Sequence, residues 1–406
     1  MSKNTHLEHL EDSILLDGKK GANDAFMFID ELCKTFSAFG NNNLKITTKW
    51  DGAPAVFCGI YPGSEMFFVG SKSIFNKDAK VNFNDRNVDE NHGSSPGLAN
   101  KLKECLKYLK PLGINGVAQG DLLFSEGDKK KEKINGQNCL IFQPNTITYC
   151  IPEEDELYEK AIKAKLGIVF HTEYKDSDGT VGGLSAKFGY DIKQLNSSKD
   201  VLVLSAETEQ LGNDILLNKS EVTNIQSLRQ KSTSLVAGNF LDIMAEHNAG
   251  KDQLAVGTRL KIFFNKYVRE GKKLPGSTAV LKEFKQYFEA EGQKAVDKLK
   301  TPKGKASKMC IVCDGLDLIK NHEKDLVNTI DLYKNLQTAK EIFIRKLEKG
   351  ERFGTYLRTE NGYRITAPEG YVAIQDGSKA VKLVDRLTFS VANFNVEKNW
   401  VAGDGK

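Results

Sequence analysis

The chain has 406 residues, of which 40% are hydrophobic, and a formal net charge of +4. This length and apolar content allow one large core or two modest ones. The small charge excludes a polycation, so any contact with nucleic acid must come from local clusters of basic residues. No segment approaches the length of a membrane span, and the polar N-terminus lacks the apolar core of a signal peptide. We expect a soluble cytoplasmic protein without a membrane partner, in the host cytoplasm if the chain is viral.

The seven cysteines are an odd number scattered through apolar segments. This distribution predicts reduced, mostly buried thiols of an intracellular protein. Cys310 and Cys313 form the only close pair, whereas a structural zinc site needs four ligands. Without a second pair or histidines at ligand spacing, the sequence does not favour a zinc site.

The spacing of apolar residues changes along the chain and predicts its organisation. In a helical N-terminal segment, Gly18 and Gly21 are expected to separate two helices. Short β-like runs follow, interrupted by a helix over 98–109. A second helical segment has apolar stripes typical of packed core faces, and the strand pattern then returns. The predicted boundaries are 1–43, 44–206, 207–349 and 350–406. This order predicts an α+β fold with a large helical insertion.

The motif Lys49-Trp50-Asp51-Gly52 is the most informative part of the sequence. It follows a β-branched run and precedes another strand-like run, so Lys49 is expected in a loop that joins two strands. A lysine in this setting could carry a nucleotide on its own side chain. A solvated lysine before an Asp-Gly turn would give the same string, because such turns are common.

Further short motifs follow in a fixed order. They are Ser71-Lys72-Ser73, Gly120-Asp121-Leu122, Ile168-Val169-Phe170-His171, Glu369-Gly370-Tyr371-Val372 and Val381-Lys382-Leu383-Val384. Together with the Lys49 motif, this series resembles the covalent nucleotidyltransferase superfamily, which includes ATP-dependent polynucleotide ligases and mRNA capping enzymes. The resemblance covers roughly half of the chain, and the order of the motifs carries it, because each one alone can match by chance. It implies an antiparallel-sheet nucleotidyltransferase domain of the ATP-grasp-like ligase type.

The resemblance implies a role for each motif. Lys49 would be the nucleophile that accepts the nucleotide, and Trp50, Asp51 and Gly52 would help to bind it. Lys72 would approach the nucleotide or the acceptor end, and Asp121 would bind the ribose hydroxyls. Phe170 would stack on the base. Glu369 would bind the metal, and Lys382 would contact the α-phosphate. Asp121 is a second candidate metal ligand, and Lys379 is a further candidate for nucleotide binding.

Several positions depart from the family's pattern. The family more often has glutamate at the position of Asp121 and commonly has aspartate at that of His171. It usually has two lysines one residue apart, whereas here Lys379 lies three residues before Lys382. Structural alternatives also stay open. Asp121 could cap a turn, and Phe170 could be a core residue, with Phe142 as a rival stacking ring. Glu369 could be an exposed turn carboxylate, and Lys72 and Lys379 could be surface lysines.

The resemblance implies ATP as the donor and Mg²⁺ or Mn²⁺ as the metal. A free lysine has a pKa of about 10.4 and is almost wholly protonated at neutral pH, but only the neutral amine attacks phosphorus. We therefore expect cationic neighbours such as Lys72 and Lys382, together with the metal, to lower the pKa of Lys49. A hard oxygen ligand such as Glu369 suits Mg²⁺.

The region after Lys382 is too short for the five-stranded barrel that usually follows the lysine motif in DNA ligases and capping enzymes. RNA ligases of the family often have a helical module instead, so RNA is favoured over DNA as the partner. Lysines in the helical segment, in a stretch expected to form a basic loop, could bind RNA or form an ordinary solvated charge run. They are Lys294, Lys298, Lys300, Lys303, Lys305 and Lys308. A DNA ligase-like enzyme, a capping-type enzyme and a non-catalytic nucleotide-binding relative remain alternatives, and no motif indicates the oligomeric state.

Overall fold

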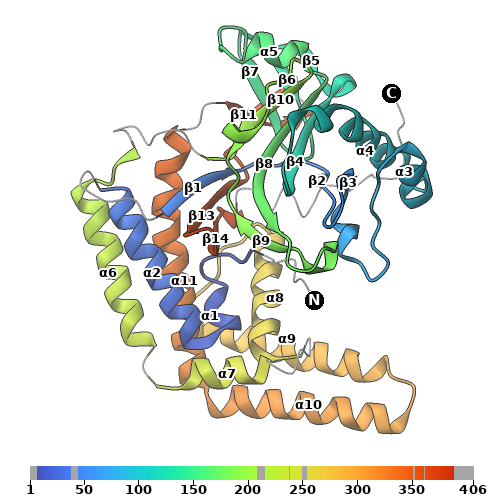
Figure 1. Ribbon diagram of the computed structural model, residues 1–406. Helices are drawn as coiled ribbons and strands as arrows, with labels where there is room; N and C mark the ends of the chain where they lie inside the picture. The colour runs from blue at the N-terminus through green and yellow to red at the C-terminus, as the bar shows by residue number, and fades with distance from the viewer. Residues whose placement is uncertain are drawn as a thin grey trace.

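The computed structural model describes residues 7–37, 44–207, 215–236, 238–248, 254–350, 353–360 and 362–387. β-Sheets form the upper part of the molecule in Figure 1, and most helices lie below and to one side of them. The fold is a mixed α+β fold in which almost all strand pairs are antiparallel, as the sequence predicts.

The first sheet joins the beginning of the chain to its end. Its order is β1 (Leu44–Lys49), β13 (Gly370–Gln375) and β14 (Lys379–Leu383), with both pairs antiparallel. The chain therefore returns, after the helical segment, to the strand that ends at Lys49. Lys49 itself is the last residue of β1 and not a loop residue as expected.

The second sheet has six strands in the order β10-β8-β4-β2-β3, with β9 paired to β8. The paired strands of this sheet are antiparallel, except for β8 and β10, which are parallel. Its strands are β2 (Ala55–Ile60), β3 (Phe67–Gly70), β4 (Val117–Ser125), β8 (Leu166–Lys175), β9 (Ser185–Phe188) and β10 (Val201–Ser205). The helix expected over 98–109 is α4 (Pro96–Leu109), which packs beside α3 (Asp85–His92) and β3.

The third sheet is antiparallel and lies at the top of Figure 1. Its strands, in sheet order, are β12 (Gly362–Ile365), β11 (Gly354–Thr359), β7 (Thr148–Pro152), β6 (Gln137–Phe142) and β5 (Lys130–Ile134). The short helix α5 (Tyr158–Lys163) packs near β6. Because β11 and β12 follow the helical segment, this sheet also combines both β-rich parts of the chain.

The helices of the N-terminus and of the helical segment share one hydrophobic core, which also includes residues of β1 and β13. They are α1 (Ser13–Leu16), α2 (Gly18–Thr35), α6 (Lys219–Leu235), α7 (Phe240–Asn248), α8 (Val256–Arg269), α9 (Ser277–Asp297), α10 (Pro302–Asn321) and α11 (Glu323–Leu347). Gly18, with a φ of +62°, lies at the expected boundary between the two helices, where it is the first residue of α2. Gly21 does not, because it lies inside α2, where a side chain would meet the carbonyl of Ser13. None of the described helices is long and apolar enough to cross a membrane.

A buried network of charged groups joins the N-terminal segment to the helices. Glu11 and Lys340 of α11 form an ion pair of 2.6 Å, and their side chains are 0% and 1% exposed. Asp12 lies 3.2 Å from Arg386 and accepts a hydrogen bond of 3.1 Å from the hydroxyl of Tyr333. Buried charges of this kind are tolerated only when they are paired, so the network fixes the N-terminal segment against α11.

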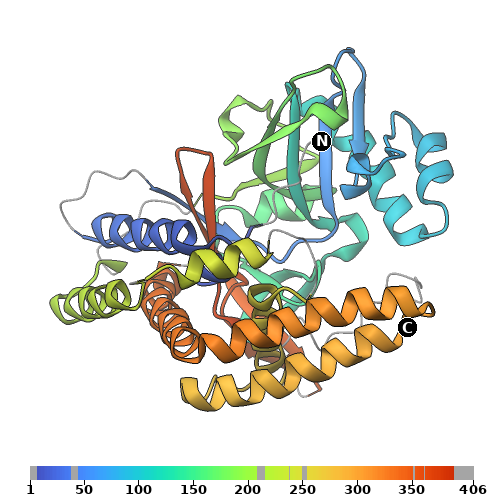
Figure 2. The same ribbon diagram turned by 90° about the horizontal axis from the view of Figure 1, so that it is seen from below.

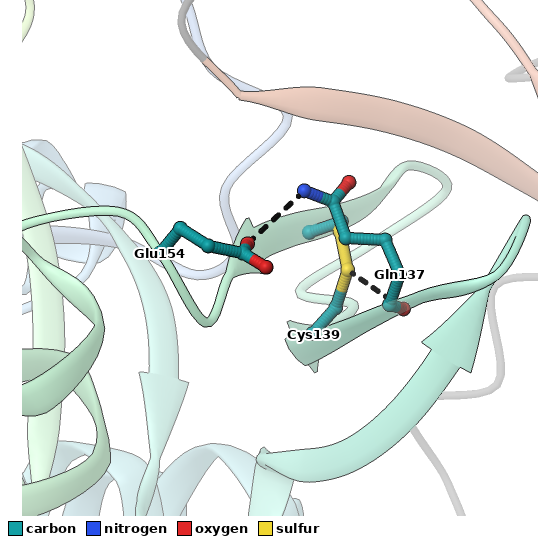
Figure 3. The surroundings of a disulfide bond; sticks show 4 residues. Gln137, Cys139 and Glu154 are labelled. Carbon is teal, nitrogen blue, oxygen red and sulfur yellow. Dashed lines mark hydrogen bonds between the residues drawn. A yellow bond between two sulfur atoms is a disulfide. The ribbon is translucent and has the colours of Figure 1, made fainter.

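Cys139 of β6 and Cys150 of β7 form a disulfide bond (Figure 3). Figure 3 also shows the amide of Gln137 donating a hydrogen bond of 3.2 Å to Glu154 beside it. The expectation of reduced thiols throughout is therefore wrong for this pair, because neighbouring strands bring the two residues together. The expectation of burial is wrong for Cys310 and Cys313, which are exposed on α10.

Candidate functional site

A cavity of about 320 Å³ lies between the first and second sheets. Its polar lining consists of Lys49, Lys72, Gln119, Asp121, His171, Thr172 and Lys382, together with Thr47 and Thr48. Its apolar lining includes Phe57, Val169, Tyr174, Ala186, Phe188, Val372 and Ile374. Clefts that combine apolar walls with a few polar groups are typical ligand sites.

The strand registers separate polar from apolar groups along the cavity. On the first sheet, Lys49 is opposite Gly370, at the other end of β13 from Ile374. On the second sheet, Asp121 is opposite Val169, whereas Tyr174 lies further along β8, opposite Ala186. Lys49 and Asp121 thus lie near the end of β1, whereas Ile374, Tyr174 and Ala186 lie further toward β9.

The ammonium group of Lys49 forms an ion pair with the carboxylate of Glu369. The register between β1 and β13 explains this contact, because Glu369 directly precedes the residue opposite Lys49. The backbone turns sharply there, since Gly370 has a φ of +146° and a Cβ atom on it would lie 2.6 Å from Val384. A side chain would be strained at this position, so glycine is required to hold Glu369 beside Lys49.

The expectation that neighbouring cations lower the pKa of Lys49 is not met. Burial alone would lower it, but the negative charges of Glu369 and Asp121 outweigh burial and raise the pKa of Lys49. Lys382 behaves in the opposite way, because burial and the nearby charge of Lys49 lower its pKa. Two carboxylates therefore hold Lys49 in its protonated form.

Lys382 reaches the cavity from β14, where it is opposite Val372. The N-terminal segment covers the free edge of β14. The backbone N–H of Lys382 donates a hydrogen bond of 2.9 Å to the carbonyl of Glu8. Leu10 returns a hydrogen bond of 3.3 Å to the carbonyl of Lys382. The N-terminal segment thus fixes the strand that carries this lysine, and Leu7 of the same segment lines the cavity.

Asp121 lies beside His171 on the neighbouring strand, with 3.6 Å between its carboxylate and the Nε2 atom of the histidine. The alternation of β8 is interrupted here, because Gly120 is opposite Phe170 whereas Gln119 is opposite Thr172. This irregularity lets the consecutive residues His171 and Thr172 both line the cavity.

Trp50, Asp51 and Gly52 differ in their positions relative to the cavity. Trp50 lines it, with its ring 4.9 Å from that of Tyr149. Asp51 does not line it and is buried with a structural role, because its carboxylate accepts backbone hydrogen bonds of 2.7 Å from Thr146 and 2.8 Å from Ile147. Gly52 packs against Asp121, where a Cβ atom would lie 2.6 Å from the Cβ of that residue.

Three other candidates lie elsewhere. Phe170 is fully buried on the opposite face of β8, with its ring 5.2 Å from that of Tyr190, so it occupies the core position that the sequence left open. The rival ring of Phe142 is also buried in a core, beside Phe124. Lys379 is paired with Asp24 of α2 at 2.7 Å and does not line the cavity.

The sequence interpretation missed Phe188, the aromatic residue at the end of β9. Phe188 is partly exposed and lines the cavity, and its backbone N–H donates a hydrogen bond of 2.9 Å to Gly377 in the turn between β13 and β14. This bond joins the two walls of the cavity. The polar and apolar alternation of Ser185 to Phe188 was a usable signal for a half-buried strand.

Comparison with known proteins identifies one family. A model of DUF6267, described as a family of unknown function, matches residues 4–398. The chain belongs to this family. No curated protein and no solved structure matches it.

The donor groups of this DUF6267 protein suit a metal ion that is also held by phosphates. No group of three or more His, Cys, Asp or Glu side chains in the described ranges is arranged to hold a metal. Asp121 lines the cavity, whereas Glu369 does not line it and is joined to it through its ion pair with Lys49. Mg²⁺ is usually bound by one or two carboxylates together with substrate phosphates and water, and this pair fits that pattern.

Proposed function

We propose that the protein is an ATP-dependent, RNA ligase-like nucleotidyltransferase that carries AMP on Lys49 and transfers it to the 5′ end of an RNA strand for sealing. One observation carries the proposal: a single cavity collects Lys49, Lys72, Asp121 and Lys382. These residues come from distant parts of the chain, and the motif resemblance assigns each of them to nucleotide chemistry. Like charges repel, so three lysines that line one cavity indicate a shared anionic ligand.

The division of the cavity fits the parts of a nucleotide. A base would lie against Phe188 and Ile374, which would cover its flat faces with apolar groups. The ribose hydroxyls would then lie near Asp121, and the phosphates would lie near Lys382. The volume of about 320 Å³ is at the lower end of the range for small-molecule sites, which suits one nucleotide.

In the first step, the neutral amine of Lys49 attacks the α-phosphorus of ATP. A nitrogen–phosphorus bond forms, the bond from the α-phosphorus to the bridging oxygen breaks, and pyrophosphate leaves with the electron pair. The amine must first lose a proton to solvent, because the ammonium form has no lone pair. Lys382 and Lys72 would stabilise the negative charge on the phosphates. Mg²⁺, when bound by Glu369 and Asp121, would add positive charge at the phosphates and compete with Lys49 for these carboxylates.

The later steps return Lys49 to its starting form. A 5′-phosphate oxygen of RNA attacks the phosphorus of the lysyl-AMP, the nitrogen–phosphorus bond breaks, and the released amine takes up a proton. A 3′-hydroxyl then attacks the 5′-phosphate, loses its proton, and AMP leaves. The choice of RNA rests on the motif resemblance, because RNA ligases of that superfamily often have a helical module and this chain has a large helical segment between the Phe170 and Glu369 motifs.

The test is covalent self-labelling. Incubation with Mg²⁺ and ATP labelled at the α-phosphate should leave label on the protein through a denaturing gel. Lys49→Ala should abolish the label, whereas Lys379→Ala should keep it, since Lys379 is a lysine of the same sheet outside the cavity. Labelling by GTP and not by ATP would favour a capping-type enzyme. No label with any of the four nucleotides, or full labelling of Lys49→Ala, would refute the proposal.

The ion pair between Lys49 and Glu369 favours a second candidate, a non-catalytic relative that binds a nucleotide in the same cavity. A protonated lysine binds phosphate well but does not attack it. This candidate predicts that calorimetry detects ATP binding, that Lys49→Ala weakens it, and that no covalent label forms.

A further inference from the structure

Four lysines lie where α9 is joined to α10, and we call this group the basic tip. It consists of Lys298 and Lys300, between α9 and α10, and Lys303 and Lys305, in the first turns of α10. All four side chains are exposed, and none forms an ion pair within the part of the chain that the structure describes. From Lys298 to Cys313 the chain has five lysines and no acidic residue. The predicted basic loop is therefore short, because α10 already begins at Pro302.

The basic tip is not explained by the stability of α10. The N-terminus of a helix carries partial positive charge, so lysines in the first turns are unfavourable there and acidic residues are preferred. The first turn of α10 has no acidic residue, and Thr301 caps it by accepting a hydrogen bond of 3.2 Å from the backbone N–H of Gly304. Four exposed lysines and a helix N-terminus thus add their positive charges in one place, next to the single negative charge of Asp297. A bound anion is the simplest compensation for this arrangement.

The basic tip is held on a rigid support. α9 packs on α10 through two close contacts, in which Gly292 faces Val312 and Gly315 faces Phe288. A Cβ atom on Gly292 would lie 2.7 Å from a methyl carbon of Val312, so glycine permits this spacing. Phe288 is itself fully buried in the helical core. The two helices that carry the tip are therefore closely packed on each other, and Phe288 anchors the hairpin in the helical core.

The α9–α10 hairpin extends to the right at the bottom of Figure 1, below β2, β3, α3 and α4 on the same side, and Figure 2 also shows it extending to the right. β2 contributes residues to the cavity, and Lys72, just after β3, lines it. A strand whose end lies in the cavity could therefore continue toward the hairpin.

We propose that the basic tip binds the phosphate backbone of the acceptor RNA; this inference rests on the proposed function. The charge of the tip is complementary to a polyanion, and exposed lysines contact phosphates without reading sequence. No aromatic residue occurs from Glu289 to Asn321, so base stacking does not contribute. The tip binds RNA strands of any sequence, while the cavity acts on the 5′ end of the bound strand.

The test compares two full-length variants that each lose four lysines. In the tip variant, Lys298, Lys300, Lys303 and Lys305 are changed to Gln. In the control variant, the same change is made at Lys130, Lys131, Lys133 and Lys160. These control lysines are exposed and lie on β5 and α5, at the opposite end of the molecule in Figure 1. The probe is a 5′-phosphorylated single-stranded RNA of mixed sequence, with binding measured by gel shift at several salt concentrations.

The tip variant should bind RNA at least about tenfold more weakly, because each lost phosphate contact removes counterion release. The slope of log affinity against log salt should fall by about 3, since each contact on a single strand contributes about 0.7. The control variant should bind within about twofold of the wild type. Both variants should melt no lower than the wild type and should label themselves with ATP as well as the wild type does.

The outcomes separate this inference from the proposed function. Absence of label on the wild type refutes the ligase, while a selective loss of RNA binding in the tip variant still supports the tip. Unchanged RNA affinity in the tip variant overturns the inference, as does equal weakening in both variants. Loss of affinity for a DNA strand of the same sequence, with RNA affinity kept, assigns the tip to DNA and also overturns it.

Discussion

Glu369 forms an ion pair with Lys49 across the register of β1 and β13, and this contact sets the charge state of the proposed nucleophile. The carboxylate favours the ammonium form, which is unreactive toward phosphorus. Under the proposed function, the free protein is thus held in a resting state. Lys49 can react only after its contact with Glu369 is weakened.

Glu369→Gln should make the amine of Lys49 more reactive. The substitution removes the charge that raises the pKa of Lys49, while burial continues to lower it. A lower pKa increases the fraction of neutral amine at pH 8, so Lys49 should be acetylated faster in the variant. Limited acetylation followed by mass spectrometry measures this, with the exposed Lys300 as an internal reference. Equal or slower acetylation of Lys49 in the variant would contradict the role of the ion pair.

Phe188→Ala should weaken nucleotide binding without unfolding the protein. Phe188 lines the cavity and is partly exposed, and loss of a ring that stacks on a base costs about 1–3 kcal/mol. The dissociation constant for ATP, measured by calorimetry, should rise about tenfold. Phe170→Ala is the matched control, since that ring is fully buried and its loss should lower stability by about 3–5 kcal/mol. Normal ATP affinity in Phe188→Ala would exclude this ring from the site.

Asp51→Ala should lower stability more than it affects a bound nucleotide. The change leaves the buried backbone N–H groups of Thr146 and Ile147 without their acceptor. Each unsatisfied group costs about 1–3 kcal/mol, so we expect a loss of about 3 kcal/mol in urea unfolding. Asp78→Ala, at an exposed position, should change stability by less than about 0.5 kcal/mol. A stable Asp51→Ala protein that fails to bind ATP would instead support direct nucleotide contact.

The sequence was most informative where a motif lies at a strand end. β-Branched and apolar runs predicted the strands around Lys49, Glu369 and Lys382, and the motif resemblance predicted that these residues meet. The antiparallel register of β1 and β13 supplies the physical reason, because it aligns the two motifs directly. The mixed α+β organisation followed from the same alternation of patterns.

The role of Asp51 and the position of Phe170 could not be predicted in this way. Asp51 is bound by a turn almost a hundred residues away in the sequence, and a hydrogen bond over such a separation leaves no local pattern. Phe170 and Val169 are neighbours on β8, and both faces of this strand are buried. An apolar run cannot tell which face lines a cavity and which packs in a core. The helical segment carried even less information, since its stripes reveal only that the helices pack.

His9 should make the protein less stable in mild acid. Its side chain is partly buried next to β14, with the Nδ1 atom enclosed, and burial holds its pKa well below the usual 6.5, with a further contribution from the positive charges of Arg386, Lys340, Lys382 and Lys261. Below about pH 6.5 the unfolded chain binds a proton at His9 that the folded chain does not bind. The free energy of unfolding therefore falls with decreasing pH, by about 1.4 kcal/mol per unit, until the folded pKa is reached.

His9→Asn removes this proton uptake, so the free energy of unfolding of the variant should depend less on pH. Urea unfolding at pH 7.5, 6.5 and 5.5 measures it, and other acidic groups titrate equally in both proteins and cancel in the difference. Between pH 6.5 and 5.5 the wild type should lose about 1 kcal/mol more than His9→Asn. Because the N-terminal segment holds the strand of Lys382, ATP labelling by the wild type should fall over the same range more steeply than labelling by the variant. Parallel loss of stability in the two proteins would show that His9 is already protonated in the folded state.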